Sequence, residues 1–264
     1  MVYDRTMDET LRAATVPELE AIPRLVHGFE QRLGPAGWET REGSRRRVAH
    51  ALAPSGRLLL LRQVHGDRIH RAPWEGLPEG DAATAAEPGL ILGIETADCL
   101  PVLLVDPRRR VVAAAHAGWR GTARGVARKT LDALIADGTR PGDVLAALGP
   151  GIGPCCYEVG PELVPEFGPG GEAFFSAGKG DRLCLDVRAA NAAQLRAGGV
   201  PPGQIHGGPL SLLPPRRSER RPHDQLHRVR EVAAVRVTPA SRTSRRGRGW
   251  PGGRRPCSAR GGRA

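Results

Sequence analysis

Two residues of types that often do chemistry, a cysteine and a histidine, flank a pair of apolar runs in the middle of the chain. Cys99 stands just before PVLLV and His116 just after VVAAA, with the charged turn DPRRR between the runs. If 101–105 and 111–115 form a hairpin centred on Arg108, antiparallel partners sum to 215 or 216 in residue number, and Cys99 faces His116. A thiolate and an imidazole so placed could share a Zn²⁺ ion or form a Cys–His nucleophile pair.

A third potential ligand follows another apolar run. RLLLLRQVHG, residues 57–66, is typical of a buried strand that ends at His65. Two histidines, one cysteine and one open coordination position describe a catalytic zinc site rather than a closed structural one. The alternative is a buried cysteine and a hydrogen-bonded strand-end histidine with no chemical role.

HAGWRG, directly after the hairpin, indicates a close approach of the backbone to His116 because its residues are small. The following segment predicts a helix over 122–137, with Thr122 as its N-cap and Gly138 as its C′ stop. Arg120 and the free amides at the start of that helix would suit a phosphate. A glycine-rich turn with a surface arginine is the alternative.

The other patterns place these residues in an alternation of strands and helices. Strands are expected at 23–29, 89–98, 143–150 and 183–187, and helices at 161–167 and 188–199. A polar leader is expected over 1–22, and loops over 33–56, 71–88 and 149–160.

Composition separates the end of the chain from the rest. The 58 residues from Gly207 carry 15 Arg, no Lys and three acidic residues, a net charge of +12 against +11 for the whole chain. The basic character therefore belongs to the tail, 209–264, which we expect to be disordered or the product of a frameshift. Specific nucleic-acid binding is not expected, because the tail has only Trp250 as an aromatic residue.

Cysteine usage and hydropathy bear on the compartment. Five cysteines, an odd number with no disulfide-like spacing, favour free thiols in a reducing cytoplasm. The N-terminus, MVYDRTMDETLRAA, is too acidic for a signal peptide and lacks its apolar core, and no run approaches the ~18 apolar residues of a membrane span.

Five motifs, in order, resemble the YfiH/LACC1 family: RQVHGD, TADCLPVLLVD, AAAHAGWRGT, LGPGIGPCCYEVG and LDVRAANAAQL. The similarity runs from 26–29 to 205–209 and implies one catalytic domain at 23–208, of the α/β (α+β) class, with mixed β-sheets and flanking helices. It also implies a zinc-dependent purine nucleoside phosphorylase with adenosine deaminase activity. The metal ligands would be His65, Cys99 and His116.

The same resemblance suggests roles for further residues. Zinc would activate water for attack on C6 of adenine, with Asp98 as proton shuttle, or alternatively Asp98 is a solvated carboxylate or a partner of a ligand histidine. Arg120 and Gly121 would hold inorganic phosphate. Tyr157 would stack on the purine base or serve as a core aromatic. Cys155 and Cys156, poor partners for a single metal, are interpreted as packing or pocket wall.

Two alternative functions stay open. A Cys–His hydrolase or amidase would use Cys99 as its nucleophile. A copper-dependent polyphenol oxidase is less favoured, because no His-x-His pair occurs. The resemblance also fails at the end of the chain, where the closing motif of the family is missing.

Overall fold

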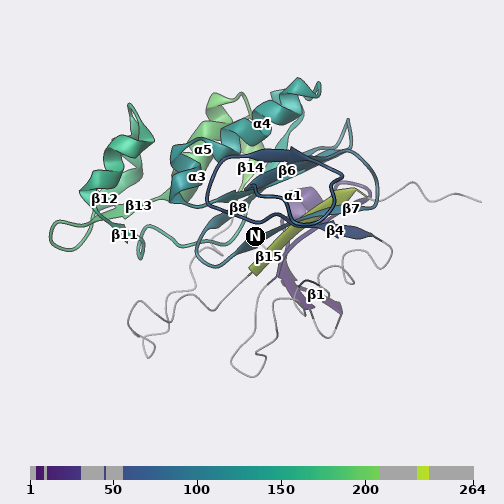
Figure 1. Cartoon of the computed structure of the whole chain (residues 1–264), viewed down its shortest axis with the longest axis horizontal. Helices are drawn as coiled ribbons and strands as arrows, with labels where there is room; N and C mark the ends of the chain where they lie inside the picture. Colours follow the sequence, from purple (N-terminus) through teal and green to yellow (C-terminus); the bar gives the residue numbers. More distant parts are fainter. Residues whose placement is uncertain (1–3, 9–10, 31–44, 46–55, 208–230, 238–264) are drawn as a thin grey trace, which may run out of the picture.

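The computed structural model describes residues 4–8, 11–30, 45, 56–207 and 231–237 (Figure 1). Its strands are β1 (Asp4–Asp8), β2 (Leu11–Ala14), β3 (Leu25–Glu30), β4 (Arg57–Leu59), β5 (Ile69–Arg71), β6 (Ala82–Ala85), β7 (Leu90–Thr96), β8 (Leu100–Asp106), β9 (Val111–Ala117), β10 (Leu145–Leu148), β11 (Glu158–Val159), β12 (Phe175–Ala177), β13 (Leu183–Leu185), β14 (Ile205–His206) and β15 (Glu231–Val237). The α-helices are α1 (Pro17–Glu20), α3 (Trp119–Ala123), α4 (Val126–Ala136) and α5 (Val187–Ala197). The 3₁₀ helices among the described residues are η1 (Pro141–Asp143), η2 (Pro161–Phe167), η3 (Gly171–Phe174) and η4 (Pro202–Gln204).

The elements form three layers. The central sheet has the strand order β14-β10-β8-β9-β6-β5, and the outer sheet has the order β1-β2-β3-β15-β7-β4. Helices α3, α4 and α5 cover the face of the central sheet that is turned away from the outer sheet (Figure 1). A small sheet, β11-β13-β12, stands at one end. Both large sheets mix parallel and antiparallel pairs, so the predicted class of mixed sheets with flanking helices is confirmed.

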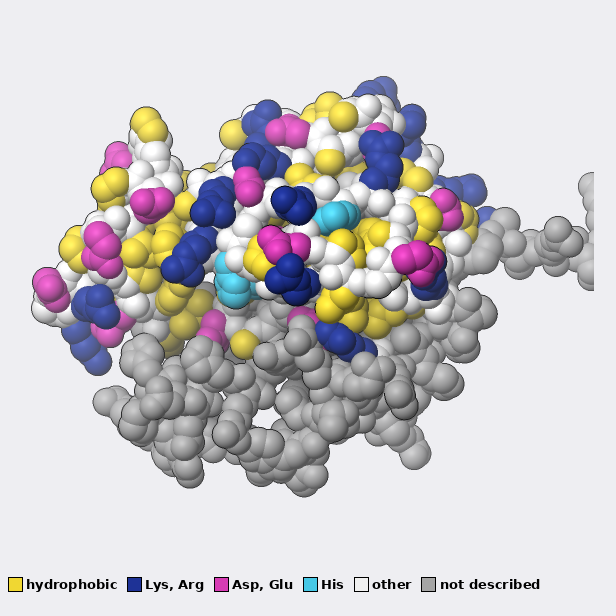
Figure 2. Space-filling view, in the orientation of Figure 1, with side chains coloured by type: hydrophobic (Ala, Val, Ile, Leu, Met, Phe, Trp, Pro, Cys, Tyr) yellow, Lys and Arg dark blue, Asp and Glu magenta, His cyan; other side chains and the backbone are white. Residues whose placement is uncertain are grey.

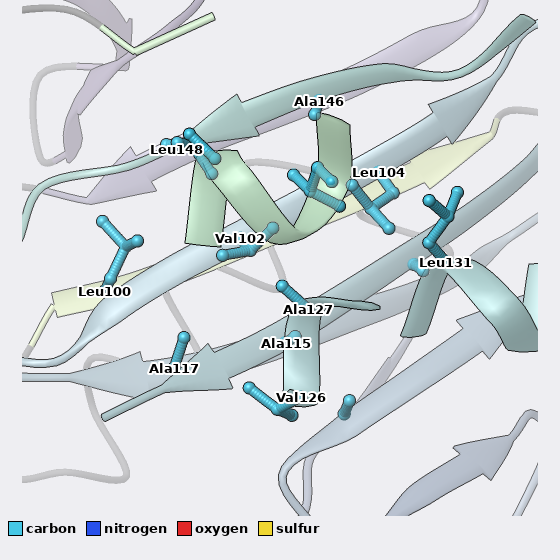
Figure 3. Packing of buried hydrophobic residues seen from close by; sticks show 14 of the residues in the cluster. Leu100, Val102, Leu104, Ala115, Ala117, Val126, Ala127, Leu131, Ala146 and Leu148 are labelled. Carbon is cyan, nitrogen blue, oxygen red and sulfur yellow. The ribbon is translucent and has the colours of Figure 1, made fainter. Parts of the chain in front are cut away.

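The central sheet is apolar on both faces, which explains the uninterrupted apolar runs of the hairpin. Along β8, Val102 and Leu104 pack with the helices, whereas Leu103 and Val105 pack with the outer sheet. Figure 3 shows the first of these clusters, in which Leu131 of α4 lies over the sheet. A strand covered on both faces gains from apolar side chains at every position, so its sequence does not alternate.

The helix predicted over 122–137 is two helices. Gly125, with a positive φ of 78°, ends α3 and precedes α4. The predicted N-cap Thr122 lies inside α3, where its buried hydroxyl accepts a hydrogen bond from Asn191 Nδ2 at 2.9 Å. The helix starts three residues earlier than expected because Gly118, in extended conformation, takes the cap position. The stop at Gly138 is confirmed by its φ of 91° and its bond to the Ile135 carbonyl.

Two segments expected to lack structure have it. The predicted leader, 1–22, contains β1, β2 and α1, and Leu19 is fully buried. The predicted loop 71–88 contains β6, whose run AATA was too short and too small to read as a strand, although it is buried throughout. The predicted loop 33–56 lies outside the described residues, apart from its positions 45 and 56.

The expected disorder of the tail is wrong for residues 231–237. There β15 lies between β3 and β7 and pairs antiparallel with both. Ala234 and Val235 are buried, and Val235 joins the cluster between the two sheets. The sequence did not predict this strand, because its short apolar run, EVAAVRV, stands among many arginines. The other positions of 209–264 lie outside the described residues, and the domain boundaries stay a prediction.

Within the described part of the chain, no helix is long and apolar enough to cross a membrane.

One buried histidine makes the stability of the outer sheet depend on pH. His27 of β3 is 3% exposed, and its Nε2 accepts a hydrogen bond from the Val16 amide at 2.8 Å. Burial lowers the pKa of His27 to about 4, against the opposing effect of Glu20. The ring is therefore neutral in the folded protein at neutral pH, as its acceptor role requires.

A first prediction tests β15. Val235→Asp places a carboxylate between the two sheets and should lower the free energy of unfolding by about 3 kcal/mol or more. Leu77→Asp, at a position 45% exposed, is the matched control and should change stability by about 0.5 kcal/mol or less. Urea unfolding measures both. Equal stability of the two variants would show that β15 does not pack between the two sheets.

A second prediction concerns acid. An unfolded histidine binds a proton near pH 6.5, whereas folded His27 binds one only near pH 4, so stability falls as pH drops through this window. Between pH 7.5 and 5 the His27 contribution should amount to about 2 kcal/mol. Urea unfolding of the wild type and of His27→Gln at both pH values should show a smaller pH dependence in the variant. Parallel losses would refute the assignment.

Candidate active site

Cys99 and His116 lie at one end of the β8–β9 hairpin, but in a different register from the one predicted. Pro101 pairs with His116, and partners sum to 217 instead of 215 or 216, because the turn Pro107–Arg110 is one residue shorter and centred later than expected. Cys99 is therefore a diagonal neighbour of His116 rather than its direct partner. A shift of two keeps side chains on the same face, so Cys99 and His116 still point the same way.

His65 completes a trio of donors from a loop that follows β4. Its ring meets the His116 ring edge-on, with centroids 4.8 Å apart. The ligand atoms of His65, Cys99 and His116 all lie within 4.8 Å of one another, so the predicted convergence is confirmed. His116 is buried, Cys99 is half-buried and His65 is exposed. The trio is thus reached from solvent on the His65 side.

Two glycines allow this approach. A Cβ at Gly118 would lie 2.9 Å from Cys99 Sγ and 3.1 Å from the His65 ring. A Cβ at Gly121 would lie 2.8 Å from the Gly66 carbonyl oxygen. The small residues of HAGWRG therefore make room for the ligand side chains, as the sequence predicted.

Asp81 is the functional residue that the sequence analysis missed. Its fully buried carboxylate accepts a hydrogen bond from His116 Nδ1 at 2.8 Å. It also accepts from the backbone amides of Val64, His65 and Gly66, at 3.2, 2.9 and 2.7 Å. Asp81 stands just before β6, directly across from His116, whose amide donates to the Asp81 carbonyl. Recognising AATA as a strand would have revealed it.

The same carboxylate fixes the backbone of the His65 loop. His65 has a φ of 60°, in the left-handed region that costs a residue other than glycine roughly 1 kcal/mol or more. Three amide hydrogen bonds to one carboxylate offset that strain. Burial alone would raise the pKa of Asp81, but its bonds to His116 and to the Gly66 and Val64 amides lower it. Asp81 is therefore a stable anion that orients two of the three donors.

Charge is arranged to favour a thiolate. Burial raises the pKa of Cys99, but hydrogen bonds from His116 and His65 bring it down to about 7. Burial lowers the pKa of His116, but bonds to Asp81 and Cys99 raise it to about 9. Because the Nδ1–H group of His116 donates a hydrogen bond to Asp81, Nε2 is left for Cys99 or for a metal ion.

This donor set fits a zinc ion. One thiolate and two imidazoles are ligands that Zn²⁺ prefers, and a carboxylate behind a ligand histidine is a recurrent partner in zinc sites. Tetrahedral bonds of ~2.0–2.3 Å place ligand atoms roughly 3.5 Å apart, so the trio needs only a small contraction to hold the ion. No other group of three or more such donors occurs among the described residues.

The predicted proton shuttle, Asp98, borders a cleft. It is exposed, and with Leu100 it lines a cleft of about 180 Å³ whose other walls are Gly151–Pro154 and Asp186–Arg188. Arg188, which sequence analysis did not single out, donates to the Leu148 and Gly149 carbonyls and holds this wall in place. The cleft adjoins the trio through the Asp98–Cys99 peptide.

The predicted substrate ligands surround the same region. Arg120 is exposed on α3, with its guanidinium 4.5 Å from the Trp119 ring centroid. Burial and the nearby charges of Cys99 and Asp98 raise the pKa of Tyr157 to about 12, against the opposing effect of Arg120. Tyr157 is half-buried and also packs on the core beneath the helices. Figure 2 shows Lys and Arg side chains spread over the helical side of this face.

A third prediction tests the buried carboxylate. Asp81→Asn should lower zinc affinity about 10- to 100-fold, because the amide weakens the hold on His116 and on the His65 loop. Competition with a chromogenic chelator measures this without reference to turnover. Asp106→Asn is the matched control, since Asp106 is also fully buried and accepts backbone amides, at the other end of β8. Equal zinc affinity in the two variants would contradict the role of Asp81.

The chain is similar to several known proteins. Residues 39–223 match the family described as multi-copper polyphenol oxidoreductase laccase. A protein of Deinococcus radiodurans named purine nucleoside phosphorylase is 42% identical over 140 residues, 53% of this chain and 55% of that protein. Adenosine deaminase RL5, from an unknown prokaryotic organism, is 34% identical over 169 residues, 56% of this chain and 62% of that protein. The matches thus span less than two thirds of these relatives.

The fold is also found in a solved structure. The crystal structure of the Bacillus licheniformis hypothetical protein YfiH superposes with a TM-score of 0.73 at 25% identity, covering 89% of this chain and 99% of that one. The matched segment, 39–223, contains all three donors and exceeds half of the chain. The chain therefore belongs to the multi-copper polyphenol oxidoreductase laccase family, the YfiH family that its motifs predicted.

Proposed function

We propose that this protein is a zinc-dependent purine nucleoside phosphorylase that also deaminates adenosine. The observation that carries the proposal is the convergence of His65, Cys99 and His116 beside a cleft. The names of the relatives, purine nucleoside phosphorylase and adenosine deaminase, support the two reactions. The substrates would be adenosine, inosine, guanosine and methylthioadenosine, with inorganic phosphate. A cytoplasmic location, expected from the free thiols, stays a prediction.

The three donors would hold the metal. When bound, Zn²⁺ would supply a Lewis acid that polarises an oxygen of water or substrate. Asp81 keeps the Nδ1 proton on His116 and so presents Nε2 to the ion. Copper is the alternative metal, since one cysteine and two histidines also suit it and the family name mentions it. Metal analysis of the purified protein distinguishes the two.

The surrounding residues would bind and orient the substrate. In phosphorolysis, the Arg120 guanidinium would hold the phosphate. One phosphate oxygen would then attack C1′ of the ribose, and the purine base would leave. Gly121 would contribute its backbone amide to that anion, because the Gly66 carbonyl oxygen occupies the space beside its Cα. Tyr157 would stack on the base. In deamination, the Asp98 carboxylate would take a proton from the attacking water and pass it to the departing amino group at C6.

A second candidate function has its own observation. Cys99, His116 and Asp81 form a continuous chain of hydrogen bonds, the order of groups found in cysteine nucleophile sites. Such a protein would be a hydrolase or amidase with Cys99 as nucleophile. The third donor, His65, favours the metal, because a nucleophile pair does not need it.

One assay separates these functions. The full chain is incubated with adenosine, and free adenine and inosine are measured with and without phosphate, with and without a chelator, and after zinc is restored. The phosphorylase requires phosphate for adenine release, and both reactions should stop with the chelator and return with zinc. Activity that survives the chelator but is lost on thiol alkylation would establish the nucleophile function instead.

A fourth prediction separates the two reactions. Arg120→Ala should lower kcat/KM for phosphate about 10- to 100-fold, the usual loss of a hydrogen bond to a charged group, and leave deamination within about 3-fold. Cys99→Ala should abolish both. Arg128→Ala removes an exposed arginine of α4 that pairs with Asp132, and serves as control. Equal losses of both reactions in Arg120→Ala would exclude Arg120 as the phosphate ligand.

A further inference from the structure

A pair of cysteines outside the candidate metal site has no role in the function proposed above. Cys155 and Cys156 are both exposed, which contradicts packing, one of the two interpretations offered for them, and leaves the pocket wall. Their sulfurs lie 2.7 Å apart and share a hydrogen bond. Two neighbouring thiols at this distance, both open to solvent, can be bridged by one reagent or joined to each other.

The pair stands on a turn that connects the cleft to Tyr157. The amides of Cys156 and Tyr157 both donate to the Gly153 carbonyl, which closes a single turn around the two cysteines. Gly153 and Pro154 line the cleft beside Asp98. The turn is therefore both the carrier of the thiols and one wall of the cleft.

The turn is also tied to the small sheet at its other end. The Tyr157 carbonyl accepts from the Leu185 amide, and Glu158 pairs with Cys184. Because both ends of the turn are held, a change in backbone conformation between residues 155 and 156 also moves Gly153 and Tyr157. Figure 2 shows hydrophobic side chains on the surface around the small sheet.

We propose that Cys155 and Cys156 form a redox-active vicinal dithiol, which hydroperoxides oxidise to a disulfide and trivalent arsenicals bind, and that the disulfide displaces the cleft wall. Adjacent Cα atoms are only ~3.8 Å apart, below the usual ~4.4–6.8 Å for a disulfide, so ring closure must distort the peptide between them. Such a strained bond is readily reduced, as a reversible switch requires.

The two sulfurs have different parts in the oxidation. The hydrogen bond with Cys155, together with burial, raises the pKa of Cys156 to about 11, so Cys156 keeps its proton at neutral pH. Cys155 sulfur attacks hydrogen peroxide, the O–O bond breaks, and a sulfenic acid and water form. Cys156 sulfur then attacks Cys155 sulfur, the S–O bond breaks, and a second water leaves. Two thiols are oxidised by two electrons, and one peroxide is reduced.

The chemistry is tested first without reference to turnover. The zinc-loaded full chain is treated with one equivalent of hydrogen peroxide, and intact mass and peptide mapping locate the product. We expect a loss of 2 Da and a bond between Cys155 and Cys156. Phenylarsine oxide should bind one per chain, with loss of one water, and should not bind after oxidation. Cys155→Ser and Cys156→Ser should lose both reactions, whereas Cys184→Ser, the matched control, should keep them.

The effect on the cleft is tested next. Hydrogen exchange over residues 151–157 should quicken at least about 10-fold on oxidation and return with dithiothreitol, the size expected if local opening becomes easier. This readout is independent of the proposed function. If the protein turns over nucleosides, the oxidised wild type should be at least about 5-fold less active than the reduced wild type. Oxidised and reduced Cys155→Ser should have equal activity.

Three results would overturn the proposal. A disulfide that involves another cysteine, or oxidation that stops at a sulfinic acid on Cys155, would exclude the vicinal pair. A Cys155–Cys156 disulfide with unchanged hydrogen exchange over 151–157 would exclude the displacement of the cleft wall. A chain that oxidises as expected but does not turn over nucleosides would refute the proposed function and leave the dithiol in place.

Discussion

The arrangement of the candidate site depends on one buried carboxylate. Asp81 is fully enclosed, yet four hydrogen bonds reach it, one from the His116 ring and three from the backbone of residues 64–66. An anion taken out of water is tolerable only when it is satisfied in this way. The carboxylate thereby links the central sheet to the loop after β4, and the position of His65 relative to His116 follows from that link.

The layers around Asp81 explain why the site lies where it does. His116 lies in β9, and Asp81 and Cys99 directly precede its two neighbours, β6 and β8, at the same end of the central sheet. They share the face that is turned toward the outer sheet, whose edge strand β4 leads into the His65 loop. Small residues on β6 and β9 let the strands and layers come close. The cleft, by contrast, is lined mainly by the loop that follows β10 and by the start of α5.

The hairpin and the three donors of the candidate site could be predicted from the sequence, because their residues stand in strong local patterns. The apolar runs on both sides of DPRRR predicted the hairpin, and parity alone put Cys99 and His116 on one face even though the register was wrong by one or two residues. Asp81 was missed because its strand consists of four small residues that resemble a loop. β15 was missed because only seven residues of apolar and charged character stand within an arginine-rich background. Both are stabilised by tertiary pairing, which local propensity does not report.

The topology of the outer sheet has a consequence for the order of folding. The central hairpin and its partner β6 lie within about 40 residues of one another, so these contacts can form early with little loss of chain entropy. The outer sheet instead needs β15, where Ala234 pairs with Gly28 about 200 residues away. On a ribosome, β3 and β7 emerge long before the strand that joins them. Their open edges must wait through most of synthesis, and in that interval the nascent chain is exposed to pairing with the wrong partner.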